Sequence, residues 1–169
     1  QDVEVLLGES IDALTSNQVA ALQASQIKAL TTKQISNLNT ATIRAFSTSQ
    51  IASIETADIV VLTQQSLARL TSQQVQSLTT DQVSAFTSVQ IASLDTVRVS
   101  ALSSPQLGAL STVNLNKISL AGFGILSSSQ LSGLTTSQII SLSNEVIARL
   151  NTSSLTGLST NQIVALTTA

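Results

Sequence analysis

The side chains able to do chemistry in this sequence are hydroxyls and carboxamides, and they recur every eight residues. Glutamine stands at the same place in eleven octapeptides, and in ten of them a serine or threonine stands three residues earlier. A hydroxyl becomes a nucleophile when a base such as histidine activates it, and the 169 residues contain no histidine, cysteine, methionine, tryptophan or tyrosine. We therefore predict no catalytic, cofactor-binding or metal-ligating residue, no cofactor, and a protein that is not an enzyme.

Charged residues are too few to suggest a polyanionic partner. Seven basic and nine acidic side chains give a net charge of -2, which predicts no nucleic-acid binding. Four of the acidic residues cluster at the start, at Asp2, Glu4, Glu9 and Asp12. They fit a solvated terminal repeat, with a calcium or partner site as the alternative. No run of 18 apolar residues occurs, so we predict no segment that spans a membrane.

Two apolar registers run through the chain with a period of eight. The register that begins at Leu6 holds leucine, isoleucine or phenylalanine at all 21 positions, and the one that begins at Val3 is apolar at all 21. We predict that both form the core, represented by Leu14, Val19, Leu22, Ile27, Leu30, Ile35, Leu78, Val83, Phe86, Ile91, Leu134 and Ile139. Because no insertion or deletion breaks the frame, we predict a single array over residues 1–169 without an internal boundary.

Each octapeptide also carries the signature of a helix start. In Thr15-x-x-Gln18 the hydroxyl accepts from the backbone three residues on, and the carboxamide reaches back to the threonine N–H. Leu14 and Val19 occupy the two positions of a hydrophobic staple, and the helix is expected over Ser16 to Ala21. The predicted caps are represented by Thr15, Gln18, Thr31, Gln34, Thr79, Gln82, Thr135 and Gln138.

A single continuous helix does not fit the period. Eight residues advance an α-helix by about 800°, so a leucine stripe would drift by about 80° in each repeat and wind around every face. Periods of seven or eleven residues keep an apolar seam, whereas a period of eight does not. The helix must therefore break once in each repeat.

A β-solenoid is the alternative fold, because threonine, isoleucine and valine favour strands. Leu14 and Val19 are five positions apart, an odd offset, so a straight strand would point them to opposite faces. A bend between them would correct this, but such bends normally need Gly, Asn or Asp, and the chain has six glycines. Short helices are thus favoured, and the predicted fold class is an all-α solenoid with one helix per repeat.

The helices must stack on one another to be stable. A six-residue helix is far shorter than the roughly 12 to 15 residues at which isolated helices become marginal in water. Neighbouring repeats must therefore share apolar faces, as in other solenoids. Small residues before each leucine, such as Gly133 and Gly157, would allow a close approach. If the helices alternate on two sides of a thin core, each pair would advance a rod by roughly 10 Å.

The repeat resembles a known pattern of surface proteins. Residues 30–35 read Leu-Thr-Thr-Lys-Gln-Ile, and residues 134–139 read Leu-Thr-Thr-Ser-Gln-Ile. This motif resembles the tandem octapeptide repeats of large proteobacterial surface proteins, labelled haemagglutinin-like, haem-utilisation or adhesion proteins. The resemblance implies an extracellular or cell-surface location. It implies no haem site, because the usual axial ligands are absent.

These observations favour a structural protein. We predict a repeat rod that forms an extracellular filament by end-to-end stacking, or that serves as an adhesin stalk. The alternative is a solenoid binding module for a peptide or glycan. Because both ends of the sequence lie within repeats, we expect either head-to-tail self-association or continuation in a longer chain.

Overall fold

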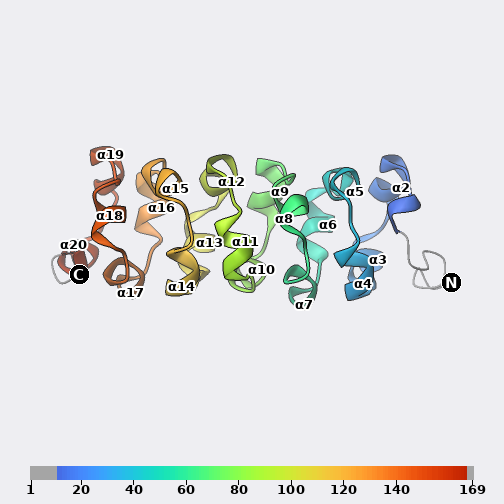
Figure 1. Cartoon of the computed structure of the whole chain (residues 1–169), viewed down its shortest axis with the longest axis horizontal. Helices are drawn as coiled ribbons and strands as arrows, with labels where there is room; N and C mark the ends of the chain where they lie inside the picture. Colours follow the sequence, from blue (N-terminus) through green and yellow to red (C-terminus); the bar gives the residue numbers. More distant parts are fainter. Residues whose placement is uncertain (1–10, 167–169) are drawn as a thin grey trace. The chain divides into compact units, whose positions relative to one another are not determined.

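The computed structural model describes residues 11–166, and the chain divides into two compact units, residues 1–86 and 87–169. Both units consist of very short helices, with no strand among the described residues (Figure 1). After a 3₁₀ turn at Ile11–Ala13, the first unit contains α2 (Ser16–Ala21), α3 (Ala24–Lys28), α4 (Thr32–Ser36), α5 (Thr40–Ala45), α6 (Thr48–Ser53), α7 (Thr56–Ile59), α8 (Gln64–Leu67), α9 (Ser72–Ser77) and α10 (Thr80–Ser84).

The second unit repeats the same arrangement. It contains α11 (Ser88–Ala92), α12 (Thr96–Ala101), α13 (Ser104–Ala109), α14 (Thr112–Leu115), α15 (Leu120–Gly124), α16 (Ser128–Ser132), α17 (Thr136–Ile140), α18 (Asn144–Ile147), α19 (Thr152–Leu155) and α20 (Thr160–Leu166). The predicted all-α fold with one short helix per octapeptide is confirmed, and the β-solenoid alternative is wrong. The prediction of one undivided array stays a prediction.

The helices end where two octapeptides join, most often at a leucine followed by serine or threonine. In α12 the C-cap Leu102 is extended, with φ -65° and ψ 133°, and Ser103, the N-cap of α13, is extended as well, with φ -76° and ψ 163°. Two extended residues in succession redirect the chain, and the hydroxyl of Ser103 then accepts from the N–H of Gln106 to begin the next helix. Pro105 lies in the first turn of α13, where its missing N–H leaves no hydrogen bond unmade.

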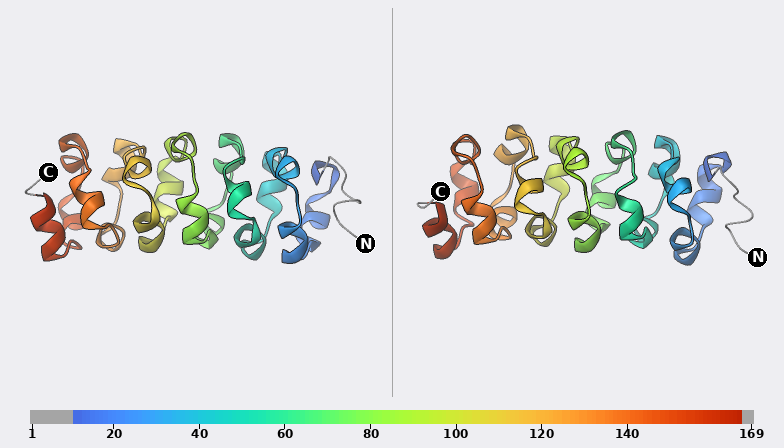
Figure 2. Two further views of the ribbon diagram at one scale, coloured as in Figure 1. Left: turned by 90° about the horizontal axis from the view of Figure 1, so that it is seen from below. Right: turned by 60° about the horizontal axis from the view of Figure 1, so that its bottom comes forward.

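Three helices, and therefore 24 residues, make one coil of the solenoid. In the first unit α2 contacts α5, α3 contacts α6, and α4 contacts α7. In the second unit α11 contacts α14, α12 contacts α15, and α13 contacts α16, so within each unit a helix packs against the third one after it (Figure 2). The two-sided arrangement considered from the sequence is thus replaced by three stacks of helices. The period of eight sets where helices break, whereas the angle between them depends on packing.

The two apolar registers fill the interior of each unit. Ten of the twelve representative core residues are buried, with exposed fractions of 5% or less: Val19, Ile27, Leu30, Ile35, Leu78, Val83, Phe86, Ile91, Leu134 and Ile139. Leu14 and Leu22 differ from the expectation, because both are only half-buried. They belong to the first described coil.

Small residues allow the helices of one stack to approach closely. Gly133 follows α16 as its C-cap, and a Cβ atom built on it would lie 2.6 Å from the Cβ atom and 2.6 Å from the carbonyl oxygen of Ser104 in α13. By contrast, a Cβ atom on Gly124, the last residue of α15, would find its nearest neighbour, the carbonyl oxygen of Arg149, at an ordinary 3.5 Å. Only the first of these glycines is required by packing.

We expect the two glycines to respond in opposite directions to alanine. Gly133→Ala should lower the free energy of unfolding by about 1–3 kcal/mol, because backbone must move to admit the methyl group. Gly124→Ala should raise it by roughly 0.5–1 kcal/mol, because alanine favours the helix and meets no obstruction. Urea unfolding followed by circular dichroism measures both values. Equal effects of the two substitutions would contradict the close approach of α13 and α16.

Candidate functional site

The predicted caps lie at helix starts in the structure. Thr15, Thr31, Thr79 and Thr135 are N-caps, and each forms a reciprocal capping box with the glutamine three residues later, at Gln18, Gln34, Gln82 and Gln138. In α10, Gln82 N donates to Thr79 Oγ1 at 3.1 Å, and Thr79 N donates to Gln82 Oε1 at 2.8 Å. This geometry satisfies two N–H groups that would otherwise lack a partner at the helix start.

The same glutamines also join one coil to the next. The amide nitrogen of Gln82 donates to the carbonyl oxygens of Ile51 at 2.9 Å and Ile54 at 2.7 Å, which lie 31 and 28 residues earlier in the previous coil. Gln138 repeats this pattern with Leu107 at 2.9 Å and Leu110 at 2.7 Å. The same pair of bonds is formed by Gln50, Gln74, Gln130 and Gln162. Each of these carboxamides therefore caps its own helix through its oxygen and binds the previous coil through its nitrogen.

These bonds are formed in the protein interior. Gln82 and Gln138 are each 2% exposed, which excludes water as a competing partner. A hydrogen bond in such surroundings contributes about 0.5–1.5 kcal/mol net, but leaving its groups unpaired costs about 1–3 kcal/mol for each. We call these recurring buried glutamines the glutamine column. Their amide groups provide the main polar contact between successive coils of each unit.

For these glutamines the sequence favoured helix caps over hydrogen-bond ladders along a fibre, although a signal for the second role was present. A capping box accepts glutamate as readily as glutamine. Yet none of the cap-forming octapeptides places glutamate at this position. Glutamate keeps the oxygen that caps the helix and lacks the N–H that reaches the neighbouring coil. The absence of glutamate therefore indicates that the glutamine positions use a donor, whereas Asp58 makes its contact as an acceptor.

Where glutamine is replaced, shorter side chains form related contacts. Ser66 Oγ donates to the carbonyl oxygen of Leu38 at 2.8 Å, the same 28-residue separation that links Gln82 with Ile54. Buried Asp58 instead accepts a hydrogen bond from the hydroxyl of Thr32 at 2.7 Å. The contact between coils is thus retained when the side chain cannot reach both carbonyls.

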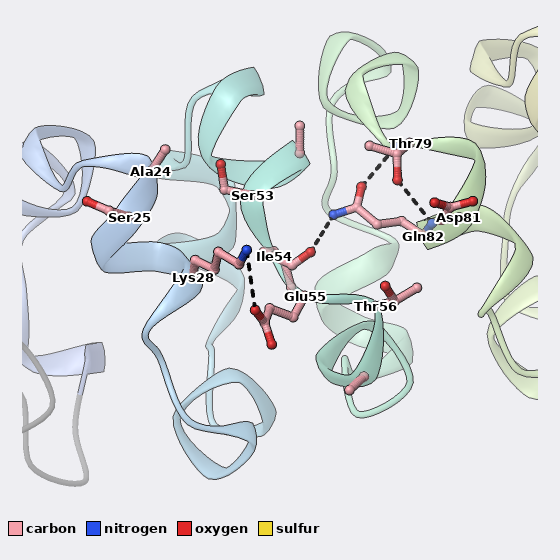
Figure 3. Close-up of a pocket in the computed structure, with 12 residues that line it drawn as sticks. Ala24, Ser25, Lys28, Ser53, Ile54, Glu55, Thr56, Thr79, Asp81 and Gln82 are labelled. Carbon is pink, nitrogen blue, oxygen red and sulfur yellow. Dashed lines mark hydrogen bonds and ion pairs between the residues drawn. The ribbon is translucent and has the colours of Figure 1, made fainter.

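A polar groove lies in the first unit beside the junction between α6 and α7. It encloses about 580 Å³ and is lined from α3, α6, α7 and α10 (Figure 3). Lys28 Nζ and Glu55 Oε1 lie 3.8 Å apart across it, with side chains that are 69% and 48% exposed. Gln82 reaches its partner Ile54 at the same place. Much of the polar lining is therefore engaged in contacts between coils.

The remaining polar candidates are structural or lie outside the described part. Asn151 begins an Asn-Thr-Ser sequence, the acceptor pattern for N-glycosylation. Its amide is used at both ends, since Oδ1 accepts from Ser154 N at 2.7 Å and Nδ2 donates to the Gly124 carbonyl at 3.2 Å. Asp2, Glu4 and Glu9, and the side chain of Asp12, lie outside the described residues. Within residues 11–166 no group of three His, Cys, Asp or Glu side chains is placed to hold a metal ion.

The fold and the hydrogen-bonded columns define an all-α solenoid repeat protein. Two stretches, residues 9–40 and 51–88, match the family model of the ALTTAQ repeat. No curated protein matches the sequence. Within residues 11–166 the structure contains no helix with the length and hydropathy needed to cross a bilayer.

Proposed function

We propose that the chain is a structural element of an extracellular fibre or adhesin stalk. The observation that carries this proposal is the double use of the glutamine column. The recurring glutamine side chains bind the previous coil, and the recurring apolar side chains are buried between coils. Such a contact can be repeated for any number of coils, so that the length of the element increases with the number of repeats. The cell-surface location rests on the resemblance of the motif.

The last described coil suggests how copies would join in a fibre. Ile163 of α20 is 44% exposed, whereas Ile139, in the same register one coil earlier in α17, is fully buried. No coil among the described residues follows α20. In the fibre, this surface would receive the first coil of another copy through the same apolar and glutamine contacts. Head-to-tail contacts that do not close produce open polymers.

Electron microscopy of the purified chain tests the fibre. We expect filaments from the natural sequence and none from Ile163→Asp, because a carboxylate at the end surface would be buried at every junction. Val97→Asp, an exposed position in α12, is the matched control and should still assemble. Discrete particles from the natural sequence would favour the stalk over the fibre.

Antibodies against the purified chain test the location that both forms share. Applied to intact cells that produce the protein, they should label the outer surface without permeabilisation. Labelling that requires permeabilised cells would overturn the proposal in both forms.

A further inference from the structure

One helix stack of residues 87–169 exposes aliphatic side chains that neither the core nor the caps require. The stack consists of α11, α14, α17 and α20, in which each helix contacts the next. Val89 is 61% exposed, Val113 63%, Ile140 49% and Val164 57%. We call these four residues the aliphatic stripe.

The register places the stripe on the outer side of the stack. Val89 and Val113 are the second residues of α11 and α14, one coil apart. Ile140 and Val164 directly follow Ile139 and Ile163 of the core register, and they too are one coil apart. On a helix, positions two and five lie three residues apart and share a face. The four side chains therefore line one surface across four successive helices.

Helix formation does not explain this choice of residues. β-Branched side chains lose rotamer freedom in helices, so exposed valine is a poorer helix former than alanine, lysine or glutamine. At the second helix position other repeats carry polar residues such as Ser49, Gln73 and Asp81. The stripe therefore has a cost for the isolated chain, which a contact with another surface would offset.

The charges of the stack point to a second copy of this chain as the occupant. None of the four helices contains Asp, Glu, Lys or Arg, and the charged residues that follow most closely along the chain are Lys117, two residues after α14, and Asp95, three residues after α11. In a twofold interface the same patch meets itself, so any charge would face a like charge. An uncharged face avoids this repulsion. A membrane surface or a charged partner would instead favour flanking basic or complementary residues.

We propose that two copies pair side by side through the aliphatic stripe. A patch on the order of a few hundred Å² is typical of functional apolar surface on a monomer. A stable interface needs about 800 Å² from each partner, so the stripe would form its centre and the surrounding serine, threonine and asparagine side chains its rim. The pairing is lateral and is distinct from the end-to-end contact proposed above.

Sedimentation velocity over a series of concentrations tests this pairing. Every variant in this experiment carries Ile163→Asp, so that end-to-end assembly does not contribute to the measured mass of the particles. We expect this parent to form dimers, and the added pair Val89→Asp and Val113→Asp to weaken dimerisation by at least about 100-fold. The matched control adds Val97→Asp and Ile125→Asp, which place the same charges at exposed aliphatic positions in α12 and at the C-cap of α15. The control should dimerise like the parent.

A milder pair, Val89→Thr with Val113→Thr, separates loss of pairing from loss of folding. Threonine has nearly the shape of valine, so the helices should persist in circular dichroism while dimerisation weakens. A parent that stays monomeric at every concentration would overturn the lateral pairing, as would a folded stripe variant that still forms dimers. Filament formation by the natural sequence is scored separately, so each proposal can fail alone.

Discussion

Leu94→Asp is expected to be among the most damaging single substitutions in the described residues. Leu94 belongs to the first apolar register and is 6% exposed. A carboxylate at this place would lose its water without gaining a partner, and such burial costs at least about 4 kcal/mol. Because each coil is stable only against its neighbours, the octapeptides on both sides should lose structure as well. Circular dichroism should show a loss of helix larger than one repeat contributes.

Ala92→Asp is the matched control, two residues earlier in the chain. Ala92 is exposed, so the added carboxylate remains hydrated. Its effect should stay within about 0.5 kcal/mol, as is usual for surface positions. Equal losses of unfolding free energy in the two variants would refute the assignment of the apolar registers.

Gln138→Glu is expected to be nearly as damaging, although the two side chains have the same shape. The carboxylate keeps the oxygen that accepts from Thr135 N at 2.7 Å. It loses the N–H that donates to Leu107 and Leu110, and it places negative charge beside both carbonyl oxygens. An uncompensated buried charge typically lowers the free energy of unfolding by about 3–5 kcal/mol. Urea unfolding of the purified variant measures the change.

Gln18→Glu provides the control, because the same exchange is made where only the cap is formed. Gln18 is exposed and accepts from Thr15 N at 2.9 Å, and its amide donates to no group within the described residues. Glutamate serves a capping box as well as glutamine does, so we expect a change of no more than about 0.5 kcal/mol. Similar losses at both positions would mean that glutamine acts only as a cap.

Local chemistry made much of this fold predictable. Thr79 and Gln82 specify a helix start through atoms only three residues apart, which a sequence displays directly. The incompatibility of an eight-residue period with a continuous helix follows from the rotation per residue. Burial of both registers follows from their composition, and Leu14 and Leu22, in the first described coil, depart from it.

Contacts between distant repeats were not predictable in the same way. A single octapeptide contains no information on whether its neighbour in space is two or three repeats away. That choice depends on the angle between consecutive helices and on how closely helices approach, as at Gly133 and Ser104. The amide nitrogen of Gln82 reaches Ile54 only because a coil contains 24 residues.

The octapeptide alone specifies the helix, its start, its break and the two side chains that it buries, because these depend on hydrogen bonds and rotations within eight residues. The three-helix coil, the second role of glutamine and the outward position of the aliphatic stripe arise only in the folded solenoid. These features depend on which repeats meet, and nearly identical repeats do not specify their partners. Packing of the whole coil determines which repeats contact one another.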